Sequence, residues 1–362
     1  MFSGKVIIIL GSRQAGKTTI IKKLSNLVKQ KQMFLNGDDP AVRQMLNNPT
    51  FSQLKQIVGN NKVIFIDEAQ RIENIGVTLK MIVDEMKGVQ VVATGSSAFE
   101  LANIINEPLT GRKWEYLLFP MSFAEMVNHT SFWEEFQNLE QRLIYGYYPE
   151  VVTSAGNQVE ILKLISDSYL YKDILILDNI KKSNKIEKLL QALALQVGQQ
   201  VSYNELAQLI GLDKATVEKY IRLLEQAFVI FRLPTLNRNL RNELKRTRKV
   251  YFYDNGVRNA ILNNFNMLSL RQDIGGLWEN FLISERMKYN HYNGNYSNYY
   301  FWRNHAQQEV DFIEEREGKL FAFEFKWNPR RKVKFPKSFI EGYPGTETKV
   351  ISQENFTEFI MD

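Results

Sequence analysis

The feature of this sequence that most constrains its fold is the run Gly11-Ser12-Arg13-Gln14-Ala15-Gly16-Lys17-Thr18, which lies between an apolar segment and a helical one. Five consecutive apolar residues, Val6 to Leu10, precede the run, and the residues from Thr18 onwards have the pattern of a helix start. The two glycines permit backbone angles that point successive N–H groups inward at a helix N-terminus, where anions bind. The order strand, glycine-bounded turn and helix therefore predicts a phosphate-binding loop.

This loop predicts binding of a nucleoside triphosphate with Mg²⁺. Lys17 is expected to reach the β- and γ-phosphates and to act in catalysis, and the Thr18 hydroxyl is placed to ligate the metal. The residues expected to contact the nucleotide are Gly11, Arg13, Gln14, Ala15, Gly16, Lys17, Thr18 and Thr19.

A second element predicts that the nucleotide is hydrolysed. The unbroken apolar run Val63–Ile66 is typical of a strand that is buried on both faces of a parallel sheet, and Asp67-Glu68 closes it. Asp67 is expected to lie beside Thr18 and to hold Mg²⁺ through water, as a Walker B carboxylate does. Glu68 is the candidate group that polarises an attacking water. The alternative is a strand end that carries two solvated acids.

Two further segments supply candidate catalytic residues. A third buried strand, Val89 to Ala93, is followed by Thr94 and Ser96, and either hydroxyl is a candidate sensor of the γ-phosphate; a simple turn explains them nearly as well. Arg112 follows Gly111 and is a candidate arginine finger, acting on its own nucleotide or on that of a neighbouring subunit in a homo-oligomer. A surface arginine in a loop is the competing interpretation.

Length and composition predict a globular protein of two or three domains. The chain has 362 residues, of which 44% are hydrophobic, and it has no cysteine, which excludes disulfides and thiolate metal sites. No apolar run is long enough for a signal peptide or a membrane span, so we expect a cytoplasmic protein without membrane contacts. The alternation of strands and helices predicts an α/β three-layer domain with a parallel sheet over residues 1–125.

The middle of the chain, residues 126–258, is predicted to be a helical region that includes a winged helix-turn-helix. Ser202 and Glu205 form a capping box for a helix that ends at Ile210, and a second helix is expected from Lys214 to about Ala227. Two strands, Phe228–Leu233 and Lys249–Tyr253, then flank a basic wing that suits phosphate contacts with double-stranded DNA. The candidate contacts are Lys214, Lys219, Arg222, Arg238, Arg241, Lys245, Arg246 and Arg248. A winged helix used only for packing or for a protein partner is an equally weighted alternative.

Residues 259–362 are predicted to form a nuclease-like α/β domain. Three segments, 299–302, 309–313 and 320–326, have the pattern of consecutive strands, and Glu324 and Lys326 share one face of the third. Asp311 and Glu324 are candidate ligands of Mg²⁺, Lys326 is placed to activate water, and Glu279 is a further candidate carboxylate. This is the arrangement of the PD-(D/E)xK nucleases, although charged residues alternate on any amphipathic strand.

Together these residues resemble a large prokaryotic family of AAA-type ATPases fused to a C-terminal domain of unknown function with a restriction-endonuclease-like core. The resemblance spans nearly the whole chain and implies ATP binding and hydrolysis; it does not imply that the C-terminal core cleaves nucleic acid. The residues that carry it are Gly11 to Thr19, Asp67-Glu68-Ala69-Gln70, Thr94-Gly95-Ser96-Ser97, Gly111-Arg112, Leu118 to Phe123, Gly146 to Glu150, Tyr171-Lys172-Asp173, Tyr251 to Asp254, and Glu309, Asp311, Glu324 and Lys326.

Three functional hypotheses follow from these patterns. The first, which we favour, is a Mg²⁺-dependent ATPase that couples hydrolysis to the recognition or remodelling of a macromolecule, for which double-stranded DNA is a candidate. The second is an ATP-gated, metal-dependent nuclease. The third is a nucleotide switch that binds protein partners without turnover.

Overall fold

The computed structural model describes residues 4–95, 108–170, 183–236 and 248–361. The chain divides into an N-terminal unit, Met1–Phe119 with Gln226–Phe228, and a C-terminal unit, Pro120–Glu225 with Val229–Asp362. We describe each unit by itself. Apart from Gln226–Phe228, the residues that were predicted to form the winged helix and the nuclease-like domain belong to the same compact unit.

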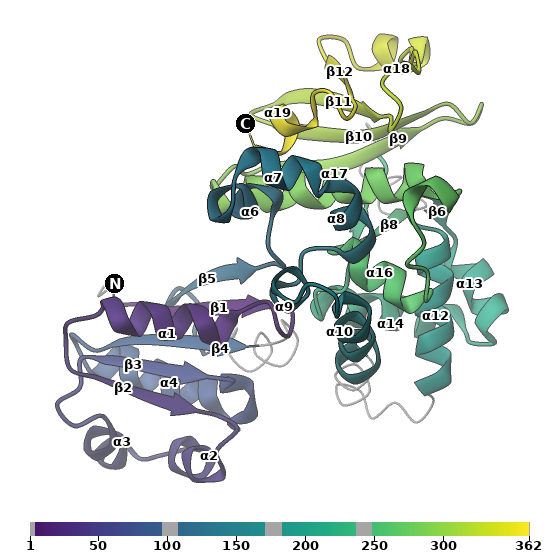
Figure 1. Ribbon diagram of the computed structural model, residues 1–362. Coiled ribbons are helices and arrows are strands. Elements are labelled where there is room, and N and C mark those ends of the chain that lie inside the picture. Colours follow the sequence, from purple (N-terminus) through teal and green to yellow (C-terminus); the bar gives the residue numbers. More distant parts are fainter. Residues whose placement is uncertain (1–3, 96–107, 171–182, 237–247, 362) are drawn as a thin grey trace. The chain divides into compact units, whose positions relative to one another are not determined.

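The N-terminal unit is built on a five-stranded parallel sheet with the strand order β2-β3-β4-β1-β5, which confirms the predicted α/β parallel architecture (Figure 1). Strand β4 separates β1, which leads into the glycine-rich loop, from β3, which ends in Asp67. Helices α1 and α4 cover opposite faces of the sheet. The elements are β1 (Val6–Gly11), α1 (Lys17–Leu27), β2 (Gln32–Asn36), α2 (Pro40–Leu46), α3 (Phe51–Val58), β3 (Val63–Asp67), η1 (Ala69–Arg71), α4 (Ile75–Glu85), β4 (Gln90–Gly95) and β5 (Lys113–Leu118).

The unbroken apolar runs that predicted these strands fill both faces of the sheet. Ile9, Phe65 and Val92 pack with Ile21 of α1 on one face, and all four are buried. Burial of large aliphatic and aromatic side chains stabilises the fold by about 1.5–3 kcal/mol for each side chain. The sheet thereby holds the carboxyl ends of β1 and β3, where the predicted site lies, on a rigid base.

The C-terminal unit begins with a layer of short helices, as predicted for the region before residue 200. Ser122 caps α6 with a complete capping box: its hydroxyl accepts a hydrogen bond from the backbone N–H of Glu125, whose carboxylate accepts one from the backbone N–H of Ser122. The elements are α6 (Phe123–His129), α7 (Phe132–Gln137), α8 (Leu139–Tyr145), α9 (Pro149–Thr153), α10 (Gln158–Leu164), η2 (Ile165–Leu170) and α12 (Ser183–Leu195). The family-type segment 171–173 lies outside the described residues.

Two helices and a small antiparallel sheet follow in the order that the sequence predicts. Helix α13 (Tyr203–Ile210) ends at Gly211, whose φ of 68° is the left-handed conformation that glycine adopts easily, and α14 (Lys214–Gln226) follows. Strand β8 (Arg248–Phe252) pairs with β6 (Gln200–Val201) on one side and β7 (Ile230–Leu233) on the other. Most of the predicted basic wing, residues 237–247, lies outside the described residues.

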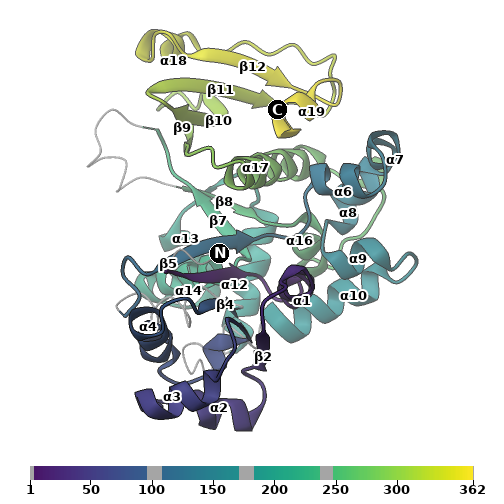
Figure 2. The ribbon, with the colours of Figure 1, turned by 90° about the vertical axis from the view of Figure 1, so that its left-hand side faces the viewer.

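A four-stranded mixed sheet forms the last part of this unit, and helix α17 runs along one of its faces (Figure 2). The order is β12-β11-β10-β9; β10 is antiparallel to both neighbours, whereas β11 and β12 are parallel. The predicted strands at 299–302, 309–313 and 320–326 correspond to three of its members. The elements are α16 (Asn255–Ile261), η3 (Leu268–Leu270), α17 (Ile274–Tyr292), β9 (Asn298–Arg303), β10 (Glu309–Arg316), β11 (Lys319–Phe325), α18 (Lys337–Gly342), β12 (Glu347–Ile351) and α19 (Phe356–Met361).

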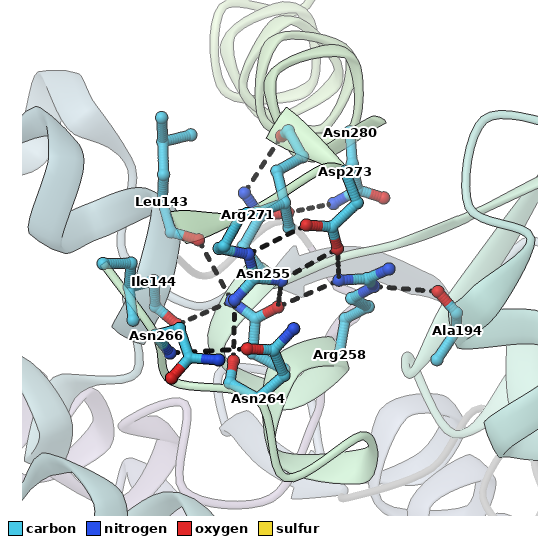
Figure 3. Close-up of polar contacts among 12 residues, drawn as sticks. Leu143, Ile144, Ala194, Asn255, Arg258, Asn264, Asn266, Arg271, Asp273 and Asn280 are labelled. Atoms are coloured by element: carbon cyan, nitrogen blue, oxygen red, sulfur yellow. Dashed lines mark hydrogen bonds and ion pairs between the residues drawn. The ribbon is translucent and has the colours of Figure 1, made fainter. Parts of the chain in front are cut away.

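A buried polar network connects α16 to the start of α17 (Figure 3). Asp273, which precedes α17, accepts hydrogen bonds from the buried guanidinium groups of Arg258 and Arg271. Arg258 also donates to the carbonyl of Ala194 in α12 at 2.8 Å. Because both arginines are buried, the single carboxylate of Asp273 is the group that makes their burial tolerable.

Among the described residues, no helix combines the length and the apolar character that crossing a membrane requires.

Candidate functional site

The glycine-rich loop joins β1 to α1 at the carboxyl edge of the N-terminal sheet. A Cβ atom on Gly11 would lie 2.1 Å from the carbonyl oxygen of Leu118, so only glycine allows β5 to approach this closely. Gly16 has a φ of 96° and open space where a Cβ would lie, and it gives α1 no side-chain cap. The first N–H groups of α1 are therefore left for an external acceptor, which is the requirement for phosphate binding.

Lys17 lies across this loop. It is 5% exposed, and its Nζ donates to the carbonyl oxygens of Gly11 at 2.9 Å and Ser12 at 2.7 Å. The ammonium group is thus held over the loop by backbone acceptors, from which it can turn to a bound phosphate. The Oγ of Ser12 is buried and has no hydrogen-bond partner among the described residues, so the loop also keeps one polar atom for a ligand.

The threonine that follows the lysine meets the carboxylate at the end of β3. Thr18 Oγ1 donates to Asp67 Oδ2 at 2.7 Å, although 49 residues separate them in the sequence. The other oxygen, Asp67 Oδ1, accepts a hydrogen bond from Thr94 at the end of β4. Thr94 Oγ1 in turn accepts a hydrogen bond from the backbone N–H of Glu68 at 3.1 Å. The hydroxyl of Thr94 therefore joins Asp67 to the backbone of Glu68, and its predicted role as a γ-phosphate sensor stays a prediction.

Glu68 is placed by a strained turn. Its φ is 50°, and its Oε2 accepts a hydrogen bond from Gln70 Nε2 at 2.6 Å. The turn packs against Gly37, where a Cβ atom would lie 2.2 Å from the carbonyl oxygen of Glu68. Gly37 also donates its N–H to the carbonyl oxygen of Asp67 at 2.8 Å. These contacts fix the backbone of Glu68 and its carboxylate at the end of β3, and its predicted role as the water-polarising group stays a prediction.

These residues fit a nucleotide and a divalent cation by the chemistry of their donors. The loop offers helix N–H groups, an ammonium group and a hydroxyl to phosphate oxygens. Thr18 and Asp67 offer neighbouring oxygen ligands, the type that Mg²⁺ prefers when phosphates complete its shell. Arg13, Gln14, Ala15 and Thr19 lie in the same loop and first helical turn.

Of the other predicted catalytic residues, Ser96 lies outside the described residues, and Arg112 does not join this group. Arg112 precedes β5, whose first residue, Lys113, pairs with Val6 at the beginning of β1. The nucleotide loop follows the other end of β1, about 16 Å further along the strand. Arg112 instead donates its Nε to Asp84 Oδ1 at 2.6 Å, so the prediction that it reaches the nucleotide of its own chain is wrong.

In the C-terminal unit, the candidate nuclease residues do come together. Lys326 Nζ lies 2.9 Å from Glu324 Oε2 and 3.4 Å from Asp311 Oδ2. Asp311 Oδ2 also accepts a hydrogen bond from the backbone N–H of Phe325 at 2.9 Å. Burial raises the pKa of Glu324 to about 7, and the negative charge of Asp311 adds to this effect.

Glu279 of α17 faces the same region, where it contacts residues that sequence reasoning did not include. Its Oε1 accepts hydrogen bonds from Lys249 Nζ at 3.0 Å and from the hydroxyl of Tyr251 at 2.5 Å. Burial raises the pKa of Glu279 to about 7 against the opposing effect of Lys249, and Asp311 raises it further. Burial alone would lower the pKa of Lys249, but Glu279 and Glu309 outweigh it, so the pKa is raised and the ammonium stays charged. The only feature of the sequence that indicated a buried ion pair with Glu279 was the position of Lys249 in a mainly apolar strand.

No group of three or more histidine, aspartate and glutamate side chains is arranged to hold a metal ion in the described part of the chain. Asp311 and Glu324 therefore supply two carboxylates, both already bound to Lys326, and the structure does not add a third to make a metal centre. The predicted metal role of this pair remains a prediction.

The basic residues of α14 lie on its solvent side. Lys214, Lys219 and Arg222 are exposed, while Val217 and Ile221 of the same helix are buried. Arg248 is half-buried at the start of β8, and the remaining candidates, Arg238, Arg241, Lys245 and Arg246, lie outside the described residues. The described part of this surface thus carries three exposed cations on one helix.

Three family descriptions match separate parts of the chain. Residues 3–127 match an AAA domain, which covers the loop, Thr18, Asp67 and Glu68. The N-terminal unit is therefore similar to AAA domains. Residues 136–268 and 274–358 match two domains of unknown function (DUF8612 and DUF4143), so the matches to the C-terminal unit assign no activity to it.

Similar proteins are themselves uncharacterized. An uncharacterized protein of Mycobacterium tuberculosis is 26% identical over 89% of this chain and 70% of its own length. An uncharacterized protein of Methanocaldococcus jannaschii is 24% identical over 92% of this chain and 78% of its own length. Among solved structures, the Walker-type ATPase PABY2304 of Pyrococcus abyssi is 14% identical, with a TM-score of 0.48 over 71% of this chain and 91% of its own.

The candidate nucleotide site also contains residues for which no role was predicted. No role was predicted for Gly37; two residues further on, Asp39 is the N-cap of α2 and accepts a hydrogen bond from the N–H of Ala41 at 2.8 Å. Gln70 stands in the segment that carries the family resemblance, but nothing in the sequence assigned it to Glu68. A glycine directly after a strand was the one signal that a close backbone approach occurs there.

Proposed function

We propose that this protein is a Mg²⁺-dependent ATPase that couples hydrolysis to the recognition or remodelling of a macromolecule. The observation that carries the proposal is the 2.7 Å hydrogen bond between Thr18 Oγ1 and Asp67 Oδ2. It brings the hydroxyl of the loop and the carboxylate of β3 to one point, where these two groups would hold Mg²⁺.

The roles of the remaining residues follow from their positions. Lys17 binds the β- and γ-phosphates once a nucleotide competes for its ammonium group. Glu68 orients and polarises the attacking water, and Thr94 holds both Asp67 and the backbone of Glu68 in place. Mg²⁺, when bound, neutralises the charge that develops on the phosphates.

The macromolecule that we propose is double-stranded DNA, and a protein partner is the alternative. Lys214, Lys219 and Arg222 form an exposed cationic face on α14, opposite its buried apolar side. Such a face suits phosphate contacts, which would make binding strongly dependent on salt. Arg112 enters the proposal only as a residue supplied by a second copy of the chain, because strand direction keeps it from its own nucleotide.

The test is ATP hydrolysis by the purified chain with Mg²⁺, in the presence and absence of double-stranded DNA. Lys17→Ala is expected to lower the rate at least about 100-fold, and Glu68→Gln about 10²–10⁴-fold with nucleotide binding retained. Lys22→Ala is the matched control, because Lys22 is an exposed residue of the same helix; it should change the rate less than about two-fold. Hydrolysis that survives Lys17→Ala at full rate would contradict the proposal.

The comparison of hydrolysis rates with and without DNA distinguishes DNA from a protein as the partner. A rate that DNA raises, and that falls back when Lys219 and Arg222 are replaced by alanine, supports coupling to DNA. Hydrolysis that does not respond to DNA points to a protein partner. Nucleotide binding without any turnover would instead support a switch. Sedimentation of the ATP-bound Glu68→Gln variant tests whether the chain forms a homo-oligomer. If it does, and if Arg112 acts on the nucleotide of a neighbouring copy, Arg112→Ala should slow hydrolysis.

A second candidate function is metal-dependent cleavage of nucleic acid by the C-terminal unit. The observation that favours it is the convergence of Asp311, Glu324 and Lys326 within hydrogen-bonding or ion-pairing distance. It predicts a Mg²⁺- or Mn²⁺-dependent nicking activity that Glu324→Ala abolishes. The absence of cleavage of DNA or RNA under varied metals would count against it.

A further inference from the structure

The segment that leads from β11 to α18, residues 326–336, is strongly basic (Figure 2). No acidic residue occurs between Glu324 in β11 and Glu341 in α18. Four exposed basic residues lie within five positions of this segment and are called the basic loop: Arg330, Arg331, Lys332 and Lys334. The ATPase function does not explain this concentration of positive charge in the C-terminal unit.

The positive charges of the basic loop are not neutralised within the protein. In the part of the chain that the structure describes, no carboxylate forms an ion pair with any of the four side chains. Other cations of the same sheet are paired: Arg303 lies 3.3 Å from Glu309, and Lys349 lies 2.7 Å from Glu358. Unpaired like charges raise the local positive potential, which attracts an external polyanion.

The basic loop is held at both of its ends. On one side, the ring of Trp327 packs edge-on against Trp278, with 5.3 Å between the ring centroids, and its carbonyl oxygen accepts a hydrogen bond from Gln353 at 2.9 Å. On the other side, Phe335 packs against the buried cluster that includes Phe339. The cations are therefore presented by a segment that is anchored twice, which lowers the cost of ordering it when a partner binds.

The same anchors indicate which kind of polyanion fits. Proteins that bind single-stranded nucleic acid combine a basic groove with aromatic side chains on which the bases stack. The two aromatic residues of the segment, Trp327 and Phe335, are half-buried and pack on the protein, so neither is presented as a stacking platform. No large apolar side chain of the segment is exposed to enter a lipid surface either. The loop therefore offers charge alone, which suits a phosphate backbone.

The length of the basic loop also fits a duplex. At most about 13 Å separates the Cα atoms of Arg330 and Lys334, because an extended chain advances about 3.3 Å for each residue. Double-stranded DNA carries about one negative charge for each 1.7 Å of its axis. A duplex thus presents several phosphates along the loop, enough to meet each of its four cations.

We propose that the basic loop binds the phosphate backbone of double-stranded DNA without reading its sequence. This inference rests on the proposal that DNA is the macromolecule that the protein recognises, and it adds a second surface to the cationic face of α14. The ammonium and guanidinium groups neutralise phosphates, and each neutralised phosphate releases counter-ions into solution. Because the loop follows β11 directly, the bound duplex would lie near the end of the strand that carries Glu324.

The experiment is a fluorescence anisotropy titration of a short labelled duplex with the nucleotide-free full-length chain at several salt concentrations. The test variant carries Arg330→Gln, Arg331→Gln and Lys332→Gln together. Its affinity should fall at least about ten-fold at low salt. The slope of log K against log salt concentration should become shallower by about 2.7, because each lost phosphate contact contributes about 0.9.

Two further variants separate a local site from total charge and from misfolding. The matched control removes the same charge from scattered exposed positions of α10, α12 and the far end of β11, with Lys163→Gln, Lys188→Gln and Lys319→Gln. Its affinity should change less than about three-fold. Arg330→Lys with Arg331→Lys keeps the charge and should also bind within about three-fold of the wild type. Circular dichroism confirms that each variant is folded.

Four results would overturn the proposal: no binding of the duplex by the wild type, a loop variant that binds like the control, tighter binding of a single strand of the same length, or equal competition by polyglutamate at the same charge concentration. The last result would identify an acidic protein as the partner. The titration contains no ATP, so a failure of hydrolysis and a failure of this surface appear in separate assays. Replacement of Lys219 and Arg222 by alanine in the same titration tests the face of α14 by itself.

Discussion

Replacement of Asp273 by asparagine is expected to destabilise the C-terminal unit by about 2–3 kcal/mol at pH 7. Asp273 is the shared acceptor of Arg258 and Arg271: Arg271 donates to it from Nε at 2.9 Å and from Nη2 at 2.8 Å. Asparagine keeps the shape and one acceptor oxygen, but it removes the charge that compensates two buried guanidinium groups.

The magnitude follows from the titration of the carboxyl group. Burial alone would raise the pKa of Asp273, but the hydrogen bonds from Arg271 and Arg258 outweigh it and lower the pKa from 3.8 to about 2. This difference in pKa between the unfolded and the folded state corresponds to about 2 kcal/mol in the free energy of unfolding. The side chain is 31% exposed, which lowers the ionic contribution, whereas leaving two buried arginines without their partner adds to the cost.

The sign of the pH dependence is a second signature. Because the pKa in the folded state lies below that in the unfolded state, the stabilisation is fully present above about pH 4. It is lost as the pH falls through the folded pKa near 2. The difference in stability between wild type and Asp273→Asn should therefore shrink between about pH 5 and pH 2.

The assay is urea denaturation followed by tryptophan fluorescence. Trp114 is the single tryptophan in the N-terminal unit, so the signal comes mainly from the other four, which include Trp278 of α17. Glu140→Gln, at an exposed position of α8, is the matched control and should change stability by less than about 0.5 kcal/mol. A value within that range for Asp273→Asn, or a difference that does not shrink at low pH, would refute the reasoning.

Three further predictions concern other buried contacts. Thr94→Val should lower kcat for ATP about 10–100-fold with little change in KM, because it removes the hydroxyl that holds Asp67 and the backbone of Glu68; steady-state kinetics checks this. Gly37→Ala should destabilise the N-terminal unit by at least about 2 kcal/mol in urea denaturation, because its Cβ would lie 2.2 Å from a carbonyl oxygen; an unchanged midpoint would contradict it. Glu279 has a pKa raised to about 7, so the stability of the wild type should fall as the pH rises from 5 to 8, and Glu279→Gln should flatten that profile.

The local patterns of the sequence were sufficient for the elements of the N-terminal unit. The apolar runs before Gly11 and before Asp67 gave strands because such runs bury both faces of a parallel sheet. The loop from Gly11 to Thr18 was predictable for the same reason: its chemistry depends on neighbours in the sequence.

In the C-terminal unit, the sequence also placed the main strands and the two helices around Gly211. Alternation along 320–326 correctly predicted that Glu324 and Lys326 share a face, and they lie 2.9 Å apart. The mixed direction of the sheet was not predictable, because the pattern of a single strand does not state which neighbour it pairs with or in which sense.

Contacts between distant segments were decided by the tertiary structure. Gly37 packs on Glu68 because β2 and β3 are neighbours in one register, and Arg112 is kept from the nucleotide because β5 runs parallel to β1. Lys249 follows Arg248 at the start of an otherwise apolar strand, and only the fold places Glu279 of α17 and Glu309 of β10 beside it. The sequence alone determined the elements and the phosphate-binding chemistry, since both depend on short-range pattern. The tertiary structure decided which side chains meet, since strand direction and register bring together residues that no spacing connects.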